Sequence, residues 1–288
     1  MHCRRQRGRV ANLRRAFYDM PSGRLLCTRC AVLRRQSRRT LCTRAGSLPR
    51  LFAHPLNAGS VELSVEESRH ATKALRLRAG DECELFDGLG HVARSRISHV
   101  DTRGGATVDA EAPAFIPWTG ARWTLAVAVT GIGNRADWCV EKCAELGVHT
   151  FVPLLTERCT SKQRRGGEEA AEHARWVRLS AAASKQSLRV HSMCIAASTR
   201  LEDLLQSGEV GKRPTLVALQ GGGPLRIALG RDELQDGGLL VVGPPGDFTD
   251  AEKQAMAQVG AISVGLGELR LRTETAAIAL VAACQLHS

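Results

Sequence analysis

Two short loops near the end of the chain carry the residue types of a ligand-binding cradle. The first, 243–248, reads Gly-Pro-Pro-Gly-Asp-Phe, and the second, 265–272, reads Gly-Leu-Gly-Glu-Leu-Arg-Leu-Arg. Glycine lets the backbone approach a ligand closely because it has no Cβ atom. Neither loop has the spacing of a dinucleotide fingerprint or a Walker A motif, so a nucleotide-binding oxidoreductase is disfavoured. Both loops are also compatible with ordinary tight turns, in which glycine and proline are common.

Each loop follows a strand-like run and precedes a helix-like one. Residues 239–242 are all apolar and predict a buried strand, and Thr249 and Glu252 have the spacing of a capping box for the next helix. The second loop enters a helix at 273–275, before the apolar run 276–283. Because open α/β sheets bind ligands beyond the carboxyl ends of their strands, we expect both loops at one edge of a sheet.

Strand and helix patterns alternate over residues 119–288. Apolar residues recur at helical spacing from Ala136 to Cys143, which predicts a helix over 135–146. The alternation predicts an α/β fold with a mostly parallel sheet and helices on its faces. Residues 51–118 instead alternate short apolar runs with turns, which predicts a separate, small β-rich domain. The other elements expected in the second domain are a helix over 169–185 and strands over 123–129, 150–155, 216–219 and 239–242.

The first fifty residues differ in composition from the rest of the 288-residue chain. They contain fourteen Arg, no Lys and one acid, which gives them a net charge of +13. Because the whole chain carries +11, the remaining residues carry −2. An Arg-rich, acid-poor head predicts a disordered organelle transit peptide over 1–50, for a mitochondrion or a plastid. The alternative is a basic arm that binds RNA directly.

The ten cysteines do not indicate a metal site. Cys27 and Cys30 form an isolated C-x-x-C without the second pair that a structural zinc site needs. We expect reduced thiols, with Cys139 and Cys143 packed as small apolar side chains, and no metal. The charge-free run 275–288 is shorter than the roughly 20 apolar residues that span a bilayer, so no membrane helix is expected.

Several longer motifs follow one another in a distinctive order. They are His70 to Asp81, Leu85 to Gly88, Asn134 to Asp137, Glu141 to Val148, Pro153 to Arg158, Gln186 to Arg189 and Leu271 to Ala276. In this order they resemble the RsmE family of ribosomal RNA uridine N3-methyltransferases, in the SPOUT superfamily. The resemblance covers nearly everything after residue 50.

The resemblance implies a fold and a cofactor that composition and periodicity do not. The family pairs a small PUA-like β-barrel, here 51–118, with a SPOUT methyltransferase domain, here 119–288, whose parallel sheet contains a deep trefoil knot. Its members are homodimers that hold S-adenosyl-L-methionine beside the dimer interface. Carried over by position, the cofactor-binding residues would be Leu219, Gln220, Gly243, Pro244, Gly246, Leu266, Gly267, Leu271, Arg272 and Thr273.

The activity implied is formation of N3-methyluridine in 16S-type, small-subunit ribosomal RNA, either free or in a pre-assembled subunit. The enzyme must hold N3 in line with the methyl group and favour loss of its proton. Our catalytic candidates are Arg272, which would stabilise the uridine anion, and Glu274, which would orient Arg272 or cap the helix. Alternatively, Thr273 and Glu274 only satisfy the helix N-terminus and its dipole. No general base is assigned.

RNA contacts are expected from local basic patches, because the chain after residue 50 is not basic overall. Such charge runs are also common on ordinary solvated surfaces. The candidates are Arg69, His70, Lys73, Arg76 and Arg78 in one patch and Lys162, Arg164 and Arg165 in another.

Three departures from the family pattern support a second hypothesis about the function. Pro245 and Asp247 stand where the family has Glu and Gly, Ile132 stands where it often has Lys, and 220–223 lacks its His-Pro-Glu-like stretch. Asp247 could strain the backbone of the first loop. The alternative function is therefore a non-catalytic RNA-binding or ribosome-assembly protein on the same fold.

Overall fold

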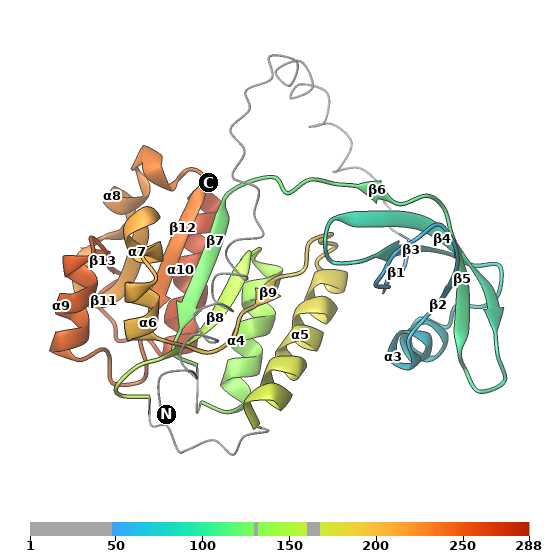
Figure 1. Cartoon of the computed structure of the whole chain (residues 1–288), viewed down its shortest axis with the longest axis horizontal. Helices are drawn as coiled ribbons and strands as arrows, with labels where there is room; N and C mark the ends of the chain where they lie inside the picture. The colour runs from blue at the N-terminus through green and yellow to red at the C-terminus, as the bar shows by residue number, and fades with distance from the viewer. Residues whose placement is uncertain (1–47, 130–131, 160–167, 288) are drawn as a thin grey trace, which may run out of the picture.

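In this computed structural model, residues 48–129, 132–159 and 168–287 are described. They form two sheet-based domains that lie side by side (Figure 1). The expected transit peptide lies outside the described residues except for its last three. Arg50 already belongs to strand β1 (Arg50–Phe52) and its guanidinium pairs with Glu84 on β3 (Glu82–Phe86), so the first sheet begins inside the segment that we expected to be disordered.

The first domain is built on one curled sheet with the strand order β1-β3-β4-β5-β2. The further strands are β2 (Gly59–Glu62), β4 (His91–Val100), β5 (Ala106–Ala110) and β6 (Ala114–Phe115), which pairs with β4. Leu51, Leu85 and Val108 are fully buried in its core. The end strands β1 and β2, both described, do not pair with each other, so the expected β-barrel is open. Helix α3 (Val65–Arg69) continues into a π-helical turn, His70–Ala74.

The second domain confirms the predicted α/β fold with a parallel sheet. Its strand order is β10-β8-β7-β12-β11-β13, every neighbouring pair is parallel, and β9 pairs with β8. The strands are β7 (Arg122–Val127), β8 (Thr150–Leu155), β9 (Cys194–Ile195), β10 (Thr199–Arg200), β11 (Thr215–Pro224), β12 (Gly237–Val242) and β13 (Ile262–Gly265).

Helices cover both faces of this sheet because its strands are apolar on both sides. Leu125 and Val127 belong to one buried cluster, while Ala126 between them belongs to the other. The first cluster includes residues of α4 (Asn134–Glu145), α5 (Glu168–Gln186), α8 (Leu225–Leu229) and α10 (Thr273–His287). The second includes residues of α6 (Leu201–Gln206), α7 (Glu209–Lys212) and α9 (Asp250–Gln258). A 3-10 turn, Asp232–Leu234, precedes β12.

Polar contacts and stacked rings join the two domains. Lys185 on α5 pairs with the buried carboxylate of Glu67 on α3, and the Ser192 amide donates to the Gly88 carbonyl at 2.9 Å. Near this junction the indole of Trp118 stacks edge-on against His149, with 4.9 Å between ring centres. Burial lowers the pKa of His149 from 6.5 to about 4, so this imidazole is neutral at physiological pH.

Within the described ranges, no helix is long and apolar enough to cross a membrane. The same ranges contain no group of three His, Cys, Asp or Glu side chains placed to hold a metal ion. Cys139 and Cys143 are both buried on α4, with their sulfur atoms 4.0 Å apart, and they contribute to the apolar cluster between α4 and the sheet.

Candidate active site

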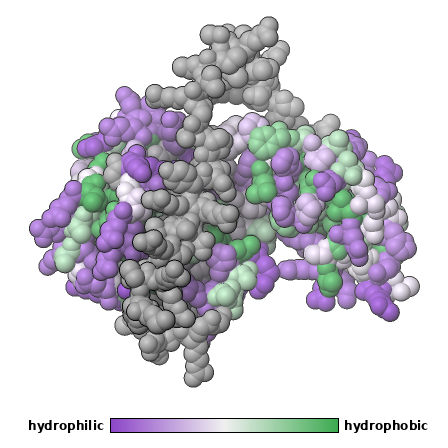
Figure 2. Space-filling view, viewed as in Figure 1, coloured by the Kyte–Doolittle hydropathy of each residue, from purple (hydrophilic) through white to green (hydrophobic). Residues whose placement is uncertain are grey.

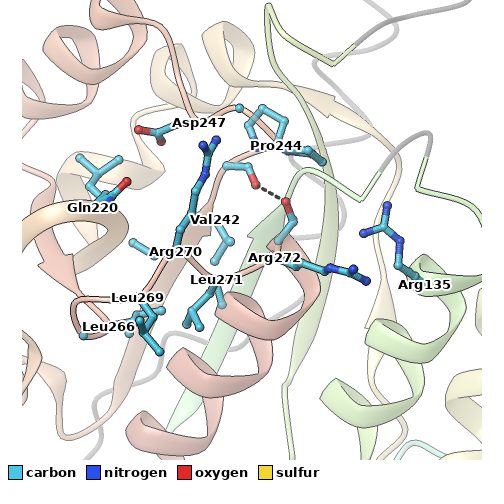
Figure 3. A pocket seen from close by; sticks show the side chains of 18 residues that line it. Arg135, Gln220, Val242, Pro244, Asp247, Leu266, Leu269, Arg270, Leu271 and Arg272 are labelled. Atoms are coloured by element: carbon cyan, nitrogen blue, oxygen red, sulfur yellow. Dashed lines mark hydrogen bonds between the residues drawn. The ribbon is translucent and has the colours of Figure 1, made fainter.

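A cavity of about 320 Å³ opens at the carboxyl edge of the second sheet (Figure 3). The loop after β12, the loop after β13 and the middle of β11, at Ala218 to Gln220, enclose it. The register of β11 against β13 shifts between Ala218 and Gly223, so the segment between them leaves the ladder and forms the third wall. Crevices at this edge of open α/β sheets are the usual ligand sites of such folds.

The first loop, 243–248, is held open by two residues in left-handed backbone conformation. Gly246 has φ 106° and Asp247 has φ 67°. Asp tolerates this region better than most residues, and both of its carboxylate oxygens are used: one accepts from the Phe248 amide at 2.8 Å and the other pairs with Lys253 at 2.8 Å. Asp247 is therefore accommodated without breaking the loop.

Contacts from outside the first loop also fix its shape. Arg158, just after β8, donates to the carbonyl oxygens of Gly246 and Asp247. Gly243 packs so tightly that a Cβ atom there would lie 2.9 Å from the ring of Phe248. The backbone of this loop is thus set by close packing at one end and by a guanidinium at the other.

The second loop is tied directly to the first. The buried hydroxyl of Thr273, at the start of α10, donates to the Gly243 carbonyl at 3.0 Å, as the dashed line in Figure 3 marks. Gly267 lies between β13 and this bond with φ 106° and no atom within 4 Å of the position of a Cβ. One hydrogen bond therefore joins loops that are 30 residues apart in the sequence.

All ten expected cofactor-binding residues line this one cavity. Arg135 and Arg270 also line the cavity, although neither was among the site residues expected from the sequence. Arg270 lies inside the second loop and Arg135 lies in the 134–137 motif, so the sequence patterns already contained both residues. The other lining residues are Ala218, Val242, Pro245, Asp247, Leu269 and Ala276.

The two catalytic candidates occupy different places. Arg272 lines the cavity with an exposed side chain and forms no ion pair with any described residue. Glu274 is buried, does not line the cavity, and accepts from Arg135 Nη1 at 3.1 Å. The orienting contact that we considered for Glu274 is therefore made with Arg135 on α4 and not with Arg272.

The first expected RNA-binding patch lies on one continuous segment, α3 and the residues after it. Arg69, Lys73, Arg76 and Arg78 are exposed there and His70 is half-buried. None of the five forms an ion pair within the described part of the chain. The second patch, Lys162, Arg164 and Arg165, lies outside the described residues.

A small β domain followed by a parallel sheet with two joined loops at its carboxyl edge is the architecture of an RNA methyltransferase with a PUA domain. Two family models match accordingly: an RNA methyltransferase domain over residues 120–285 and an RNA methyltransferase PUA domain over 63–111. The chain belongs to the ribosomal RNA small subunit methyltransferase E family, RsmE.

Individual relatives resemble this chain over most of its length. The enzyme of that name from Synechocystis is 30% identical over 75% of this chain and 70% of its own. The one from Bacillus subtilis is 26% identical over 76% of this chain and 87% of its own. The crystal structure of the Neisseria gonorrhoeae enzyme bound to S-adenosyl methionine is 27% identical, with a TM-score of 0.70, over 83% of this chain and 97% of its own.

Proposed function

We propose that this chain transfers the methyl group of S-adenosylmethionine to N3 of a uridine in small-subunit ribosomal RNA. The observation that carries the proposal is the cavity at the carboxyl edge of the sheet, which is lined by both glycine loops and by Ala218, Leu219 and Gln220 of β11. Family membership and the cofactor-bound relative from Neisseria gonorrhoeae support the same reaction class.

The residues present fit this cofactor. Gly246 and Gly267 have positive φ values and open space where a side chain would begin, so the backbone of both loops can contact a ligand closely. Pro244, Leu266 and Leu271 supply apolar surface for an adenine ring. When bound, S-adenosylmethionine would supply an activated methyl group on a cationic sulfur.

Arg272 is our candidate for stabilising the uridine once N3 has lost its proton. A guanidinium stays charged at any working pH, so it can balance negative charge on the base but cannot accept the proton. Its exposed side chain lines the cavity from the residue just before α10 and extends toward Arg135 (Figure 3). Placing a fixed positive charge where negative charge develops is among the most effective ways to lower such a barrier.

Three finer features belong to the same proposal. A homodimer is supported by α10, whose run from Ala276 to Ala283 is apolar on every side and whose Leu286 is 88% exposed in the single chain. A trefoil knot is supported by family membership and by the strand order, in which β11 lies between β12 and β13. Import into a mitochondrion or plastid is supported by the Arg-rich, acid-poor composition of residues 1–50.

The test combines cofactor binding with product analysis. Calorimetry should detect stoichiometric binding of S-adenosylmethionine, and nucleoside mass analysis should detect 3-methyluridine after incubation with small-subunit ribosomal RNA or with assembled subunits. RNA binding without cofactor binding or product would instead favour the non-catalytic assembly protein.

A further inference from the structure

Three arginines line the cavity, and they carry more positive charge than the proposed cofactor can pair. Arg135 comes from the start of α4, and Arg270 and Arg272 come from the second loop. Among the described residues, the only acid that lines the cavity is Asp247, which already pairs with Lys253. S-adenosylmethionine brings one carboxylate against an ammonium and a sulfonium, so it is itself cationic. Glu274, just outside the cavity wall, offsets the charge of Arg135, but Arg270 and Arg272 form no ion pair with any described residue. The positive charge that remains therefore indicates a second ligand that is anionic.

Arg135 is held at the cavity by an ion pair with Glu274, which does not itself line the cavity. The side chain of Glu274 is only 5% exposed, whereas that of Arg135 is 44% exposed. A buried carboxylate is costly unless it is paired, so Glu274 keeps the guanidinium nearby. Arg135 Nη1 donates to its two oxygens at 3.1 and 3.5 Å. The remaining N–H groups of the guanidinium have no acceptor within the described residues, although a guanidinium has five such donors.

The side chain of Arg272, on the residue just before α10, extends toward Arg135 at the start of α4 (Figure 3). No described acidic residue lining the cavity lies between these two charges, so an anion placed there would relieve their repulsion. The planar fork of a guanidinium matches phosphate oxygens, and phosphates are the anions that an RNA substrate provides in every nucleotide.

We propose that Arg135, anchored by Glu274, binds a backbone phosphate of the RNA beside the nucleotide whose base enters the cavity. The proposal rests on the proposed function and adds a positioning residue to it. Glu274 acts through Arg135 and does not contact the reacting atoms.

The experiment measures RNA affinity as a function of salt, without turnover. Full-length protein loaded with S-adenosylhomocysteine, which cannot donate a methyl group, is titrated with transcribed small-subunit ribosomal RNA at several salt concentrations. Each lost phosphate contact should lower the slope of log K against log salt by about 0.7 to 0.9. Arg135→Gln should show that loss and bind RNA about tenfold or more weakly at low salt. Arg135→Lys, which keeps the charge, should keep most of the slope.

Arg175→Gln is the matched control. Arg175 on α5 has a side chain 45% exposed and is paired with Asp137 at 2.9 Å, but it does not line the cavity. This variant should keep the wild-type salt slope. Glu274→Gln should weaken RNA binding about threefold or more, with cofactor affinity unchanged, because Arg135 loses its charged anchor.

Each other outcome overturns the inference in a recognisable way. Weaker cofactor binding by Arg135→Gln with an unchanged salt slope would make Arg135 a cofactor residue. A lower melting temperature with both affinities unchanged would make the ion pair purely structural. If wild-type protein forms 3-methyluridine while the variant slope is unchanged, only this inference fails. If wild-type protein neither binds nor methylates the RNA, the proposed function fails with it.

Discussion

The bond between Thr273 and Gly243 makes a quantitative prediction about cofactor binding. Thr273→Val replaces a hydroxyl by a methyl group of similar size, so it opens no cavity. It removes the donor 3.0 Å from the Gly243 carbonyl, at a residue that is only 6% exposed. Leaving a buried acceptor without a partner costs about 1 to 3 kcal/mol. If the joined loops form the cofactor site, the affinity for S-adenosylmethionine should fall roughly 5- to 150-fold.

The assay is a calorimetric titration of the variant with S-adenosylmethionine, together with its thermal unfolding. The melting temperature should fall by about 2 to 4 °C for each kcal/mol lost in a protein of this size. Thr273→Ser keeps the hydroxyl and serves as the control, with an affinity within about threefold of wild type. A folded Thr273→Val protein with wild-type affinity would show that the two loops are held together by other means.

Four further predictions test other parts of the proposal. Arg272→Ala should lower single-turnover methylation by about a hundredfold or more while leaving cofactor affinity nearly intact, and Arg272→Lys should restore little; unchanged turnover would refute its catalytic role. Burial lowers the pKa of His149 from 6.5 to about 4, so protonation of this imidazole disfavours the folded state. The free energy of unfolding should therefore be constant above pH 6.5 and fall by about 1 to 3 kcal/mol as the pH is lowered to 4. Thermal midpoints measured against pH should show this loss, and His149→Asn should flatten it. A chain starting at Leu48, before β1, should bind cofactor and methylate RNA like the full chain; loss of methylation in a purified assay would favour the basic-arm reading. Light scattering should give a dimer for wild type and a smaller mass for Leu286→Glu, whereas a wild-type monomer that still methylates RNA would contradict the dimer.

Local patterns were sufficient for the elements that position the site. The helix predicted over 135–146 is α4 at Asn134–Glu145, and the strand predicted over 150–155 is β8 with the same bounds. Periodicity reports which face of a segment is buried, and glycine and proline mark where a segment ends. Both loops could therefore be found from their composition and their place between a strand and a helix.

Contacts between distant segments could not be found in this way. Arg135 and Glu274 are 139 residues apart, and no local pattern pairs them. The strand expected to end at 219 continues to Pro224, because the chain rejoins its neighbour after the bulge. Asp247 was recognisable as unusual, but only the folded chain brings Lys253 and the Phe248 amide to its carboxylate.

The junction of the two loops has a consequence for how long this protein persists in a cell. A ligand that binds only the folded state stabilises it by mass action, by about 2.7 kcal/mol at a hundredfold excess over Kd. Since the loops joined by this bond connect β12 to α9 and β13 to α10, a methyl donor seated between them would hold residues 237–287 against local opening. Proteolysis of the protein would then be slower with the methyl donor bound than without it.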